Sequence, residues 1–116
     1  MNPLDDLKAA VTAQHDLIAQ LKRDADQCQK DIEDARTAWV HARQALLNRI
    51  ASTWAAPSEA ERSQLDGAIE SRRAELDSRE EAARAVDTRL KQANDRLSNM
   101  RQTWDPILGP FPTGDT

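Results

Sequence analysis

Mostly apolar residues recur at alternating steps of three and four along this chain. In the first half the row consists of Leu4, Leu7, Val11, Gln14, Ile18, Leu21, Ala25, Cys28, Ile32, Ala35, Trp39, Ala42 and Leu46. In the second half it consists of Leu65, Ile69, Arg72, Leu76, Arg79, Ala83, Val86, Leu90, Ala93, Leu97, Met100 and Trp104. We call these sets the first and second core rows. A period of 3.5 residues, sustained for about six heptads in each row, predicts a left-handed coiled coil.

One break separates the two rows. No Gly or Pro occurs between Leu4 and Ala56, and Pro57 then interrupts the pattern. Ser58 and Glu61 follow with the spacing of a capping box, in which each side chain accepts the other residue's backbone N–H. The sequence therefore predicts helices at 4–55 and 59–104, joined by a turn at 56–58.

The second helix should end near Trp104, because Pro106 lacks a backbone N–H and crowds the preceding turn. Residues 105–116 then form a tail rich in Pro and Gly. Since the connection at 56–58 is short, the helices should run antiparallel. We therefore predict an all-α fold, a long antiparallel helical hairpin (two-helix coiled coil) at residues 1–104 with a Pro/Gly-rich C-terminal tail at 105–116.

A trial register in which paired residue numbers add to about 115 sets large core residues against small ones at several levels. It places Trp39 beside Leu76, and Ile18 beside Leu97. It also places Arg49 opposite Asp66, so that opposite charges face each other.

The same register brings the apolar residues of the tail opposite the first residues of the chain, with Leu108 near Leu7 and Phe111 near Leu4. We therefore expect Ile107, Leu108 and Phe111 to clasp the open end of the hairpin. Two alternatives stay open: the tail is disordered, because Gly and Pro also mark linkers, or it binds a partner.

A second apolar row exceeds what the hairpin needs. Val40, Leu47 and Trp54 recur every seven residues, and Ile50 lies beside them. Each residue of this repeat follows a core position by one residue, which turns it about 100° away on a helix. The same stretch, residues 35–57, contains three arginines and no acid. Aromatic and aliphatic residues with Arg are typical of protein interfaces. The predicted partner-binding residues are Val40, Arg43, Leu47, Ile50 and Trp54. The alternative is that Trp54 folds over the turn and that the others are scattered surface residues.

The sequence contains few residues that could act as nucleophiles or metal ligands. Cys28 is the only cysteine and falls in the first core row, which favours a buried structural thiol over a redox or lipidated one. His15 and His41 would lie about 39 Å apart on one helix and cannot share a metal. The sequence contains no Ser/His/Asp set and no phosphate-binding Gly loop. We expect no enzyme activity, no cofactor, no metal and no small-molecule substrate.

Charge and hydropathy bound the partners and the location. The chain carries 16 basic and 20 acidic residues with no basic block, which argues against nucleic-acid binding. No apolar run approaches the roughly 20 residues of a membrane span, and the first residues do not resemble a signal peptide. We therefore expect a soluble cytoplasmic protein. Arg outnumbers Lys twelve to four, which suggests a bacterial source with a GC-rich genome.

The interpretation that fits these patterns is a non-enzymatic coiled-coil module for protein–protein interaction or assembly. It would associate with itself into a helical bundle or bind a partner helix. One alternative is a stalk-like or small chaperone component of a bacterial secretion or motility apparatus, on architectural grounds alone. Another is a coiled-coil arm excised from a larger protein.

Overall fold

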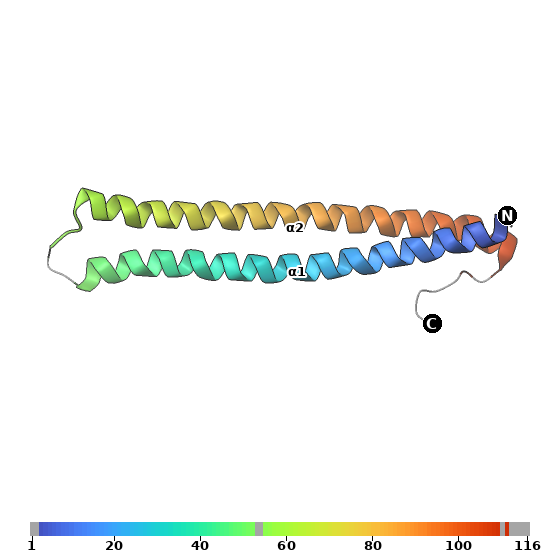
Figure 1. Cartoon of the computed structure of the whole chain (residues 1–116), viewed down its shortest axis with the longest axis horizontal. Helices are drawn as coiled ribbons and strands as arrows, with labels where there is room; N and C mark the ends of the chain where they lie inside the picture. Colours follow the sequence, from blue (N-terminus) through green and yellow to red (C-terminus); the bar gives the residue numbers. More distant parts are fainter. Residues whose placement is uncertain (1–2, 53–54, 110, 112–116) are drawn as a thin grey trace. The chain divides into compact units, whose positions relative to one another are not determined.

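The computed structural model describes residues 3–52, 55–109 and 111 of the chain. Helix α1 spans Pro3–Ser52 and helix α2 spans Glu59–Leu108, each 50 residues long (Figure 1). The described residues contain no strand, and the two helices pack against each other as a helical hairpin. The predicted all-α helical hairpin is therefore confirmed. Beyond α2 the structure describes only Gly109 and Phe111, so the Pro/Gly-rich tail stays a prediction.

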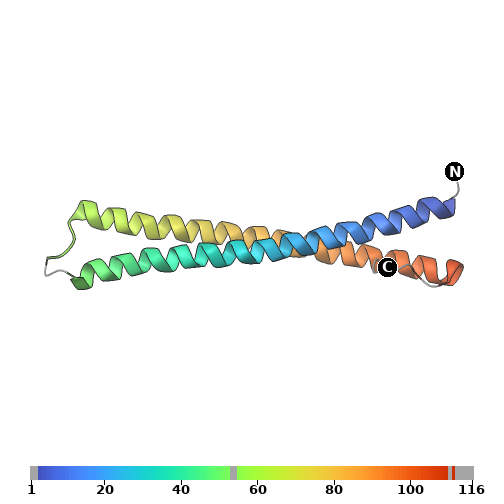
Figure 2. The same ribbon diagram turned by 60° about the horizontal axis from the view of Figure 1, so that its bottom comes forward.

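The chain divides into two compact units, each containing a segment of α1 beside a segment of α2. The terminal unit consists of Met1–Asp26 and Arg84–Thr116, and the turn unit consists of Gln27–Ala83. Within the turn unit the two helical segments lie side by side in both views (Figures 1 and 2). Among the described residues, neither helix has both the length and the hydropathy needed to cross a membrane.

The core of the turn unit is a thin layer between its two helical segments. Ile32 and Ala35 from α1 are buried with Leu76 from α2, and Trp39 and Ala83 pack against them. All five belong to the core rows, because the 3.5-residue period keeps these positions on the side that faces the other helix. The predicted proximity of Trp39 and Leu76 is therefore confirmed.

The terminal unit is built in the same way. Ile18 and Leu21 are buried with Ala93, and Leu90 and Leu97 pack against this cluster. Leu97 therefore packs against the cluster that contains Ile18.

Gln14, the polar member of the first core row, is buried in the terminal unit. Its Nε2 donates a hydrogen bond of 2.8 Å to the backbone oxygen of Ala93. This contact supplies a partner for an amide that would otherwise cost free energy to bury.

The charged side chains correct the trial register by about one helical turn. Arg49 pairs with Glu61 rather than Asp66, and Asp66 accepts from Arg62 instead. Across the two helices, Nη1 of Arg79 lies 3.6 Å from Oδ2 of Asp31. The size of core residues alone does not fix the register to better than one turn, because each turn of the rows offers a similar choice of large and small residues.

Both predicted C-terminal helix ends need correction. The described part of helix α1 reaches Ser52, and Ala55, the predicted last residue, lies outside the helix. Helix α2 continues past Trp104 and through Pro106 to Leu108, so the predicted stop was wrong. The φ of proline suits a helix, and its cost is one missing N–H and some crowding. The helix ends instead at Gly109, whose φ of +81° is left-handed and whose N–H donates to the oxygen of Asp105 at 3.3 Å.

Candidate protein interface near the hairpin turn

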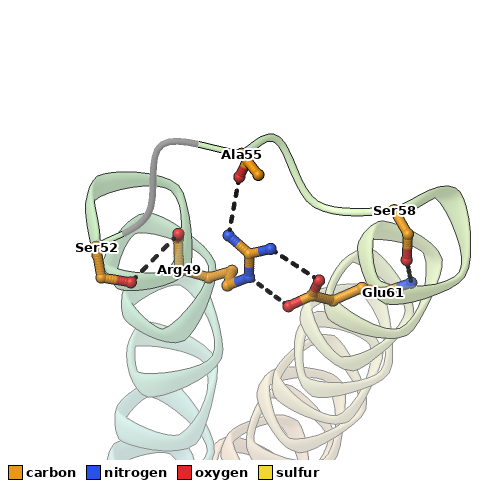
Figure 3. Close-up of polar contacts among 5 residues, drawn as sticks. All are labelled: Arg49, Ser52, Ala55, Ser58 and Glu61. Atoms are coloured by element: carbon orange, nitrogen blue, oxygen red, sulfur yellow. Dashed lines mark hydrogen bonds and ion pairs between the residues drawn. The ribbon is translucent and has the colours of Figure 1, made fainter.

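A polar cluster ties the end of α1 to the start of α2 (Figure 3). The guanidinium of Arg49 donates to both carboxylate oxygens of Glu61, with the Nη2–Oε2 contact at 3.0 Å. Its Nη1 donates to the backbone oxygen of Ala55 at 3.2 Å. Two parallel bonds from one arginine to one carboxylate fix direction as well as distance. The cluster therefore holds the turn end of α1 in a defined position beside α2.

The cap of α2 uses only one half of the predicted capping box. The N–H of Glu61 donates to the Ser58 hydroxyl at 3.1 Å, as the spacing predicts (Figure 3). The Glu61 carboxylate, however, is bound to Arg49. The reason is electrostatic, because a charged guanidinium is a stronger partner for a carboxylate than a neutral backbone N–H.

The second apolar row lies on the surface of α1. Val40 is 48% exposed, Leu47 is 55% exposed and Ile50 is 47% exposed. They are the only large hydrophobic residues that the described part of the turn unit exposes to this degree. Trp54, the fourth predicted member, lies outside the described residues. We use the name surface row for Val40, Leu47 and Ile50.

Two arginines stack on Trp39, the residue that precedes Val40 of the surface row. The guanidinium carbon of Arg43 lies 4.9 Å from the centre of the Trp39 ring, and that of Arg73 from α2 lies 5.1 Å from it. Such cation–π contacts contribute about 0.5–1 kcal/mol each at exposed sites. Arg73 also pairs with Asp77 at 3.2 Å. Arg73 was not among the predicted residues, because the trial register sets it level with Ala42 rather than with Trp39.

The two helices of the turn unit carry opposite charge. Residues 35–57 contain three arginines and no acid, whereas residues 59–81 contain eight acids and four arginines. Arg49 forms an ion pair with Glu61. Among the described residues, no ion pair joins Arg36 or Arg43 to an acid. The surface row is therefore bordered by positive charge that the described part of the chain does not neutralise.

Charged side chains line a groove between the two helical segments of the turn unit. In the turn unit, a shallow groove of about 210 Å³ is lined by Asp31, Asp34, Ala35, Ala38, Arg72, Glu75 and Arg79. Arg79 pairs with both Asp31 and Glu75 there, so the charge of this arginine is compensated within the groove. No group of three or more His, Cys, Asp or Glu among the described residues could hold a metal. Cys28 is a half-buried free thiol.

The three residues predicted to clasp the open end of the hairpin have different surroundings. Phe111 is partly buried, with its ring 5.7 Å from that of Trp104 in a T-shaped contact and 6.1 Å from that of His15. Ile107 and Leu108 belong to the last turn of α2 rather than to the tail, and Ile107 is 74% exposed. The extension of α2 explains this difference, because the helical backbone fixes where these two residues lie.

No protein-family model, no curated protein and no solved structure matches the chain.

Proposed function

We propose that this chain is a non-enzymatic coiled-coil assembly module that associates with itself into a helical bundle. The observation that carries the proposal is the surface row of Val40, Leu47 and Ile50, which are about half exposed on one helix. Apolar side chains grouped in this way on a soluble protein mark contact sites for other molecules.

The exposed area supports the proposal. The chain exposes 8600 Å². A compact monomer of its mass, 13.0 kDa, would expose about 6,300 Å². Protein interfaces of standard size bury about 800 Å² on each partner. Covering the surface row in a bundle would thus remove part of an unusually large exposed surface and stabilise the fold.

The test is a matched pair of charge substitutions on α1. Leu47→Glu places a charge within the surface row, and His41→Glu places the same charge on an exposed residue about 120° away around the helix. Size-exclusion chromatography with light scattering should show the parent above its monomer mass of 13.0 kDa. We expect Leu47→Glu to weaken association at least tenfold, or about 1.4 kcal/mol, and His41→Glu to associate as the parent does.

Circular dichroism should report unchanged helix content in both variants, because Leu, His and Glu differ little in helix propensity. A parent protein that stays at 13.0 kDa at all concentrations would contradict self-association. The surface row would then bind a helix of another protein.

A further inference from the structure

We infer that the surface row is covered by the same row of a second copy, with the two α1 helices packed antiparallel about the level of Leu47. This inference rests on the proposed function and adds the face of the second copy that covers the row and the orientation of the two helices. In such a dimer Leu47 packs against its own copy and the hairpins extend in opposite directions. The charges around the surface row decide between this arrangement and a parallel one.

A parallel dimer would place like charges together. It would set Arg36 beside its own copy and Arg43 beside its own copy, with no acid in residues 35–57 of either chain to compensate. Like charges placed opposite each other between helices are destabilising and act against that pairing.

An antiparallel dimer about Leu47 separates these charges. The two copies of Arg43 would lie about 12 Å apart along the helix axis, at 1.5 Å per residue. That distance exceeds the Debye length of about 8 Å at physiological ionic strength, so their repulsion is largely screened.

The antiparallel arrangement also supplies an acid for Arg43. The ion pairs of Arg49 with Glu61 and of Arg79 with Asp31 fit the same antiparallel register, in which Ala51 of α1 is about level with Glu59, the first residue of α2. Packing about Leu47 makes Arg43 of one copy level with Ala51 of the other, and hence with its Glu59. Glu59 is exposed and makes no ion pair among the described residues. Each chain thus offers both an arginine and an acid that lack a charge partner, as a two-fold symmetric interface requires.

Single-cysteine cross-linking tests the orientation. Leu47→Cys and Val40→Cys are each made in a Cys28→Ser background, so that each chain holds one thiol and each variant loses one residue of the surface row. A disulfide needs the two Cα atoms within about 7 Å. In the antiparallel dimer only Leu47→Cys should form a disulfide-linked dimer, because the copies of position 40 lie about 21 Å apart along the axis.

Efficient cross-linking through both positions would show a parallel dimer and overturn the inference while leaving self-association intact. Cross-linking through neither position, with a monomer mass, would overturn the inference together with the proposed function.

A double-mutant cycle tests the charge pair independently. Arg43→Gln and Glu59→Gln should each weaken association by roughly two- to fivefold, as is typical of exposed ion pairs. The double variant should associate about as tightly as the single variant with the lower affinity, since the two changes remove one interaction. In a parallel dimer Arg43→Gln would strengthen association by removing a repulsion, and effects that simply multiply would also contradict the pair.

Discussion

Leu76 and Leu47 give a matched test of which helical faces form the core of the turn unit. Leu76 on α2 is 2% exposed and packs among residues of α1, whereas Leu47 on α1 is 55% exposed. Leu→Ala at each site removes the same atoms and improves helix propensity slightly in both cases. The two substitutions therefore differ only in the burial of the lost side chain.

The magnitude follows from the lost burial. Leu→Ala removes the equivalent of three methylene groups, worth about 2.4 kcal/mol at 0.8 kcal/mol each when fully buried. A cavity term adds to this, but a two-helix core can relax around the gap, which keeps that term small. We expect Leu76→Ala to lower the free energy of unfolding by about 3 kcal/mol and Leu47→Ala to change it by less than about 0.5 kcal/mol.

Urea denaturation followed by circular dichroism at 222 nm measures both changes. The parent and both variants are compared over a dilution series, and values are taken where the midpoint no longer depends on protein concentration. Association then does not contribute to the effect of Leu47→Ala. Equal losses at the two sites under these conditions would refute the assignment of Leu76 to the core and Leu47 to the surface.

Three further predictions concern single positions. Gly67→Ala should raise the free energy of unfolding by up to about 1 kcal/mol in urea denaturation. The reason is that a Cβ there meets no atom within 4 Å and the helical φ suits alanine. A loss of stability would mean that α2 is not a regular helix at this point. Ser58→Ala should lower the free energy of unfolding by about 1 kcal/mol by removing the N-cap of α2, whereas Ser63→Ala, at an exposed position inside α2, should leave it unchanged or raise it slightly; an equal loss at both sites would contradict the capping role. Phe111→Ala should cost about 0.5–1.5 kcal/mol through the lost ring contact with Trp104 and should shift tryptophan fluorescence; an unchanged melting temperature and spectrum would show that Phe111 does not hold the tail on the helices.

The order of the two helices and the identity of their buried residues could be read from the chain itself. Ile32, Leu76 and Ala93 are buried because a 3.5-residue period repeats the same face at each turn, whatever the detailed register. The exposure of the surface row could be predicted from the same rule, since Val40 and Leu47 come one residue after core positions.

The tertiary structure decided which charged and aromatic groups meet. The sequence offers several acids near the start of α2 as partners for Arg49, and it does not rank Glu61 above Asp66. The stacking of Arg73 on Trp39 depends on the level at which two helices meet, to within one turn.

The end of α2 shows the same division. Pro106 gives a stop signal in the sequence, yet the helix continues to Leu108 and Gly109 supplies the left-handed residue that ends it. A proline costs a helix one backbone hydrogen bond, and its effect on the boundary depends on what the neighbouring residues gain by staying helical. Periodicity fixes which face of a helix is buried, because every turn repeats it. Register, ion pairs and helix ends depend on small free-energy differences between neighbouring alternatives, which only the packed helices resolve.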